Sequence, residues 1–177
     1  MKKSNVILIW GVGTAVVTAI FSQVLSISDN PNSGVRYFAY LILFGGLFVG
    51  LLQYRKANGG YLKFGEGFGA AMLMTLIVAF ISVISLFIVL KSQPGYIDKI
   101  LTLAQQNMVN KGFTQDQIDT NMKYARIFTT PRMLYIFSFI GSLIGGAIFS
   151  LIAAGLASKQ KPIFEDADEM PNHETNN

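Results

Sequence analysis

Residues 67–90 read GFGAAMLMTLIVAFISVISLFIVL and contain no charged side chain. A helix needs about 20 residues to cross a hydrocarbon core about 30 Å thick, so this stretch is long enough to span a membrane. Three further charge-free segments occupy residues 4–28, 37–54 and 133–158. The sequence therefore predicts four membrane-spanning helices, at about residues 6–27, 35–54, 65–90 and 131–157.

The composition of the chain favours a bilayer as its solvent. Hydrophobic residues make up 51% of the 177 residues and charged residues 14%, with a mean hydropathy of +0.45, whereas about a quarter of an ordinary soluble domain is charged. We expect an all-α integral membrane four-helix bundle over residues 1–158. Residues 159–177 form a polar tail with an acidic run between Glu165 and Glu169, and so polar a segment is expected to be disordered.

The first span has one rival explanation. Lys2 and Lys3 precede its apolar run, as basic residues precede the apolar core of a cleaved signal peptide. Such cores are usually about 7–15 residues long, whereas residues 6–27 stay apolar or weakly polar throughout. We therefore expect a retained membrane helix.

The connection at residues 93–129 is predicted to be an amphipathic helical hairpin. Its first helix has apolar residues at helical spacing on one face, namely Ile97, Ile100, Leu101, Ala104 and Met108. A C-cap glycine and a capping box with two staple positions follow, at Gly112, Phe113, Thr114, Gln117 and Ile118. Thr130 is expected to cap the fourth span and Pro131 to open it. We expect the hairpin to lie on the membrane surface or on the bundle.

Small residues on spans two and four predict close contacts between helices. They recur at every fourth position or in G-x-x-x-G pairs, at Gly46, Gly50, Gly141, Ser142, Gly145, Gly146 and Ser150. A homodimer seam and packing within one bundle would both explain such a face. We favour packing within the bundle, because four helices must already pack against one another.

Residues that could carry chemistry are scarce. The chain has no cysteine, and its single histidine, His173, lies in the polar tail, which argues against disulfides, thiolate sites and a histidine-based metal site. No ionisable side chain falls at mid-membrane, where proton relays and substrate pathways usually place one. Residues 65–70 spell a dinucleotide-binding turn, but no strand precedes them and no acidic residue follows at the required distance. We therefore assign no catalytic, cofactor or metal residue.

The membrane interfaces hold the remaining polar candidates, at Tyr61, Lys63, Phe64, Glu66 and Arg132. Glu66 lies near the start of the third span, where the helix macrodipole favours an anion. Clustering of several charged residues in one interfacial pocket would favour headgroup chemistry. Their dispersal on separate edges would argue against it.

Several of these features together resemble a known family. The resemblance is carried by residues 59–65 (GGYLKFG), the capped hairpin at Gly112-Phe113-Thr114, the opening at Thr130-Pro131, residues 141–146 (GSLIGG) and the basic residue Lys159. In this order they look like bacterial membrane proteins of the domain of unknown function (DUF) 4199 family, over nearly the whole chain. The resemblance implies a location in the bacterial cytoplasmic membrane. It implies no activity, ligand or catalytic residue.

The leading functional hypothesis is a non-enzymatic helix-packing protein or accessory component of a larger assembly. The alternatives are a small oligomeric transporter or channel and an interfacial enzyme that acts on lipids. The expected partners are the lipid bilayer and either a second copy of the chain or another membrane protein. No cofactor is expected, and because the basic residues are spread along the chain, nucleic acid is not expected either.

Both termini are expected in the cytoplasm. Four spans put them on one side of the membrane, and each side holds seven basic residues. Six of those on the far side are spread over the long hairpin connection. The positive-inside rule depends on basic residues close to the ends of the spans, so the denser terminal side is predicted to be cytoplasmic.

Overall fold

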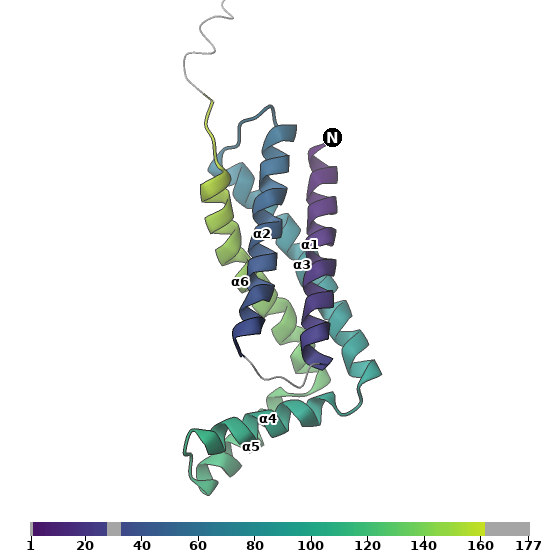
Figure 1. Ribbon diagram of the computed structural model, residues 1–177, viewed down its shortest axis with the longest axis vertical. Coiled ribbons are helices and arrows are strands. Elements are labelled where there is room, and N and C mark those ends of the chain that lie inside the picture. The colour runs from purple at the N-terminus through teal and green to yellow at the C-terminus, as the bar shows by residue number, and fades with distance from the viewer. Residues whose placement is uncertain (1, 28–32, 162–177) are drawn as a thin grey trace, which may run out of the picture.

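The computed structural model describes residues 2–27 and 33–161, and Figure 1 shows the arrangement of its helices. Within these ranges the helices are α1 (Lys3–Ile27), α2 (Ser33–Ala57), α3 (Phe64–Ser92), α4 (Tyr96–Asn110), α5 (Gln115–Phe128) and α6 (Pro131–Ala157). Helices α1, α2, α3 and α6 are each long and apolar enough to cross a membrane. The prediction of an all-α bundle with four spans, and a helical hairpin between the third and fourth, is confirmed.

The four long helices lie side by side in one bundle (Figure 1). Helix α1 contacts α2 and α3, α6 also contacts both of them, and α2 contacts α3. At one end of the bundle α1 begins, α2 ends, α3 begins and α6 ends, and we call this the terminal end. The opposite end carries α4 and α5, and we call it the hairpin end.

Apolar side chains fill the centre of the bundle and also cover its outside. Leu47, Leu51 and Met74 are completely buried, whereas Ile20 and Ile144 are about 60% exposed, at 59% and 61%. So continuous an apolar surface is a liability in water, but in lipid it is well solvated. The chain is therefore a multi-pass membrane protein whose outer surface contacts the bilayer.

Two local caps close the hairpin between α4 and α5. Gly112 has a φ of 76°, which glycine adopts without steric cost, and the amide of Phe113 donates to the carbonyl of Met108 at 3.1 Å, as in a Schellman motif. At the start of α5 the amide of Gln117 donates to Thr114 Oγ1 at 3.4 Å, and the amide of Thr114 donates to Gln117 Oε1 at 3.0 Å. The two hydrogen bonds between Thr114 and Gln117 form a complete capping box.

The hairpin is held by contacts between its two helices, where only part of its apolar surface is buried. Ile118 and Met122 of α5 are buried, and α4 contacts both α5 and α3. Figure 1 shows that the hairpin reaches sideways from the hairpin end and does not run along the bundle. Tyr124, Ile127 and Phe128 stay more than half exposed, and we expect the membrane surface to cover them.

The structure differs from two local predictions. Thr130 makes no side-chain capping hydrogen bond, although Pro131 does open α6; proline lacks the N–H group and has the φ of a helix, so it starts a helix without a side-chain acceptor. Lys159 belongs to the segment that is predicted to be disordered, but its backbone pairs with that of Leu62. The acidic run of the tail and His173 lie outside the described residues.

Candidate functional site

An ion pair between Lys3 and Glu66 lies at the terminal end of the bundle. Glu66 stands in the first turn of α3, and its Oε1 accepts from Lys3 Nζ of α1 at 3.1 Å and from the Tyr54 hydroxyl of α2 at 3.3 Å. Its Oε2 accepts from Asn58 Nδ2 at 3.0 Å. We call Lys3, Tyr54, Asn58 and Glu66 the polar clasp. It ties the ends of three helices to one carboxylate.

Further hydrogen bonds connect the end of α6 to the same part of the structure. The amide of Leu62 donates to the carbonyl of Lys159 at 2.8 Å, and the amide of Lys159 donates back to Leu62 at 2.9 Å. Arg55 Nη1 at the end of α2 donates to the carbonyl of Ala157, the last residue of α6, at 3.0 Å. Together with the polar clasp, these bonds position the loop before α3 against the chain that leaves α6.

An open cleft of ≈ 700 Å³ lies between that loop and the end of α6. Most of the residues that line it carry polar side chains, and they include the carboxylate of Glu66 and three lysines, Lys63, Lys159 and Lys161. The Lys159 ammonium lies 5.7 Å from the centre of the Tyr61 ring, within range of a cation–π contact. Because Glu66 is paired with Lys3, the charge that the cleft presents is basic.

The structure brings three of the five predicted interfacial residues together. Tyr61, Lys63 and Glu66 all line the cleft. Phe64, which follows Lys63 in the sequence, is 48% exposed and stacks on Phe68 with the ring centres 6.4 Å apart. Arg132 does not join them, because it lies in the first turn of α6, at the hairpin end.

Sequence reasoning missed the partners of Glu66. Lys3, Tyr54 and Asn58 lie 63, 12 and 8 positions away from it. One available signal was that four alternating spans bring the start of span one, the end of span two and the start of span three to the same side. A lone carboxylate at that level requires a partner, and Lys3 was the basic residue at the start of the neighbouring span.

The predicted small residues divide into two groups. Some meet side chains of neighbouring helices: a Cβ at Gly46 would overlap Thr14, and one at Gly50 would lie 3.0 Å from both Trp10 and Met74. Gly141 and Gly145 have no atom within 4 Å of such a Cβ. The glycines of span two therefore allow α1 and α3 to pack closely against α2. The G-x-x-x-G pair of α6 contacts no other helix among the described residues.

Gly146 and Ser150 of α6 belong to a buried polar contact with α3. Thr75 and Ser150 are 1% and 0% exposed, and their hydroxyl oxygens lie 3.1 Å apart in a hydrogen bond. A Cβ at Gly146 would overlap the Thr75 side chain. Gly146 therefore leaves the space in which Thr75 reaches Ser150, while Ser142 on the same row is only half-buried.

The described residues differ from what a metal site or a dinucleotide-binding turn requires. No group of three or more His, Cys, Asp or Glu side chains that could hold a metal occurs among them. The letters of a dinucleotide-binding turn, at residues 65–70, lie in the first two turns of α3, preceded by the Leu62 bridge. A Cβ at Gly67 would lie 3.1 Å from Leu62, so this glycine serves the packing of the loop.

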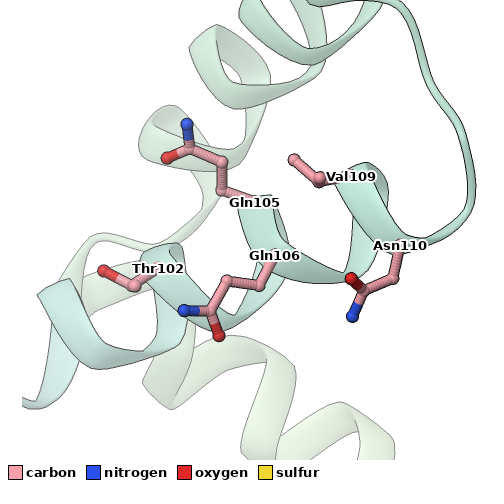
Figure 2. Close-up of a pocket in the computed structure, with 5 residues that line it drawn as sticks. All are labelled: Thr102, Gln105, Gln106, Val109 and Asn110. Atoms are coloured by element: carbon pink, nitrogen blue, oxygen red, sulfur yellow. The ribbon is translucent and has the colours of Figure 1, made fainter.

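A second, shallower depression of ≈ 330 Å³ lies on the hairpin. Figure 2 shows the five side chains that line it, all of them on α4: Thr102, Gln105, Gln106, Val109 and Asn110. None of them is ionisable, and no second helix contributes to the lining. We assign no site here, and the cleft at the terminal end remains the candidate site.

Comparison with known proteins gives a family but no activity. A family described as "Protein of unknown function (DUF4199)" matches residues 8–159. No curated protein matches the chain, and no solved structure does. The matched residues include nearly all of the bundle, the whole hairpin and the lysines at positions 63 and 159. Since this match covers far more than half of the chain, the protein belongs to the DUF4199 family.

Proposed function

We propose that this protein is a non-enzymatic accessory component of the membrane, which works by binding other membrane constituents at its terminal end. The observation that carries the proposal is the polar clasp. Glu66 joins helix ends, because both of its oxygens accept hydrogen bonds from other helices or from the loop after α2. The neighbouring lysines, by contrast, line an open cleft.

The interior of the bundle supports binding over transport. A passive pore through one chain needs a continuous polar path. The buried polar side chains of α3 and α6, Thr75 and Ser150, bond to each other instead, and Leu47, Leu51 and Met74 are completely buried around the centre of the bundle. This buried core favours binding over transport through a single copy of the chain.

The proposal predicts a bound constituent and no turnover. Full-length protein extracted into polymer-bounded native nanodiscs should carry a lipid or protein at fixed stoichiometry in native mass spectrometry. The same protein, incubated with a total membrane lipid extract, should leave every lipid species unchanged. A new lipid product that disappears in Glu66→Gln, or an ion flux in proteoliposomes, would contradict the proposal in favour of an enzyme or a channel.

We also propose that the membrane is the cytoplasmic membrane of a bacterium, with the terminal end inside. Support comes from the charges at that end. Among the described residues it holds seven basic side chains, at Lys2, Lys3, Arg55, Lys56, Lys63, Lys159 and Lys161, and one acidic side chain, that of Glu66. All seven lie within a few residues of the end of a span, where basic residues count toward the positive-inside rule.

Thiol labelling tests this orientation cleanly, because the chain has no cysteine of its own. Asn110→Cys places a thiol at the exposed tip of the hairpin, and Gln160→Cys places one just beyond α6. In intact cells a membrane-impermeant maleimide should label Asn110→Cys and leave Gln160→Cys unlabelled until lysis. The reverse pattern would place the termini outside.

A further inference from the structure

We propose that the cleft at the terminal end binds the phosphate-bearing headgroup of an anionic phospholipid. This inference rests on the proposed function and names the constituent that is bound. Two lysines, Lys63 and Lys159, line the cleft from two sides, one at the start of α3 and one in the chain after α6. The bridge between Leu62 and Lys159 holds these two sides together.

The charge of the cleft suits an anion. Its only described carboxylate, Glu66, forms an ion pair with Lys3 at 3.1 Å and accepts two further hydrogen bonds. Lys63 and Lys159 are exposed, and a lysine ammonium binds phosphate as a compact charge with three donors. The cleft therefore offers cationic donors around one space, with its acidic group already neutralised.

The start of α3 adds a second anion-binding feature. Lys63 is the N-cap residue of this 29-residue helix and makes no side-chain capping hydrogen bond. A lysine has no acceptor with which to cap amides, and the positive end of the helix dipole lies here. An acceptor from outside the chain therefore meets both the dipole and the Lys63 ammonium at the same position.

The position of the cleft favours a lipid over a soluble phosphate compound. The cleft lies directly beyond the apolar spans, at the level where headgroups meet water. Phe64 and Leu156, at the adjoining ends of α3 and α6, are 48% and 63% exposed. A ligand with a phosphate and acyl chains would place its charge beside the lysines and its chains along this apolar surface. A soluble phosphate would use only the lysines.

Titration of lipid onto delipidated full-length protein in mild detergent tests the proposal. Native mass spectrometry should show more bound phosphatidylglycerol than phosphatidylcholine. Lys63→Gln and Lys159→Gln should each weaken phosphatidylglycerol binding by about fivefold, as expected for one lysine at a membrane surface. Lys159→Gln keeps the bridge to Leu62, which uses only backbone atoms.

Lys56→Gln is the matched control, because Lys56 is exposed at the same end of the bundle and does not line the cleft. Equal weakening by Lys56→Gln would overturn the proposal in favour of a general charge effect. Lys63→Arg and Lys159→Arg should retain binding, which guards against variants that merely misfold. Complete displacement of the lipid by millimolar inorganic phosphate would also overturn it, since the cleft would then recognise phosphate alone.

Failure of this inference is distinguishable from failure of the proposed function. A protein partner that depends on the same lysines, with no preference for phosphatidylglycerol, would overturn the lipid assignment and leave the binding role intact. Lipid turnover or ion flux would overturn the binding role itself.

Discussion

Replacing Gly146 with leucine is expected to destabilise the bundle strongly, whereas the same change at Gly145 is expected to have little effect. At Gly146 even a Cβ atom overlaps the side chain of Thr75, and a branched side chain cannot be placed without separating α3 from α6. Overpacking of this kind costs about 1–3 kcal/mol. The buried hydrogen bond between Thr75 and Ser150 would break as well, which adds about 0.6 kcal/mol in a membrane protein. At Gly145 no atom lies within 4 Å of a Cβ.

The two variants are measured by unfolding in mixed micelles of mild detergent and dodecyl sulfate. Gly146→Leu should lower the ratio of folded to unfolded protein by at least about fivefold, with Gly145→Leu close to the parent. A double-mutant cycle identifies the contact. Thr75→Ala removes the atoms that collide with a Cβ at position 146, so the double variant with Gly146→Ala should lose less stability than the sum of the two single variants. Equal stability of the two leucine variants would mean that α3 does not rest on Gly146.

These two neighbouring glycines show what the sequence could and could not predict about the bundle. Small residues at every fourth position indicate a surface for a close helix contact. Successive residues on a helix point about 100° apart, so Gly145 and Gly146 cannot face the same neighbour. Hydropathy does not choose between them, because the lipid side and the inner side of a membrane helix are both apolar. Only the positions of the other helices show that Gly146 meets Thr75 and that Gly145 faces outward.

The candidate site was predictable only in part, for a related reason. Lys63 and Glu66 were recognisable at an interface because charged residues end the apolar run next to them. Their roles depend on contacts with residues far away in the sequence. The carboxylate of Glu66 is neutralised by Lys3, and the cleft exists because Lys159 pairs with Leu62. The order of the spans places candidate partners at the same end of the bundle, but a single sequence does not show which of them make contact.

Local structural features could be predicted in most detail, and the hairpin shows why. A capping box requires a threonine and a glutamine three positions apart, and both of its hydrogen bonds join residues within four positions of each other. Thr114 and Gln117 make those two bonds in the structure. A Schellman glycine is equally local, and Gly112 has the positive φ that it needs. What the sequence could not specify was the surface against which the hairpin packs.

Replacing Ile118 with aspartate should open that hairpin. Ile118 is only 3% exposed, and it is buried where α5 meets α4. The change removes about 1.5–3 kcal/mol of apolar burial and places a carboxylate where it has no partner, which costs several kcal/mol more. Helices of 15 and 14 residues are marginal without tertiary contacts. We therefore expect the amides of α4 and α5 to lose most of their protection from hydrogen exchange in nanodiscs, while those of the bundle keep theirs.

Two comparisons separate packing from charge and from capping. Ile127→Asp introduces the same charge on the same helix at a side chain that is 54% exposed. It weakens contact with the membrane surface but not the buried packing of α5, so exchange in the hairpin should rise far less than in Ile118→Asp. Thr114→Ala removes only the N-cap, which costs about 1 kcal/mol, and should speed exchange about fivefold in the first turn of α5. If Ile118→Asp and Ile127→Asp gave the same exchange pattern, the contact between α4 and α5 would not be what holds the hairpin together. Adsorption of its exposed aromatic residues to the membrane surface would then have to stabilise it.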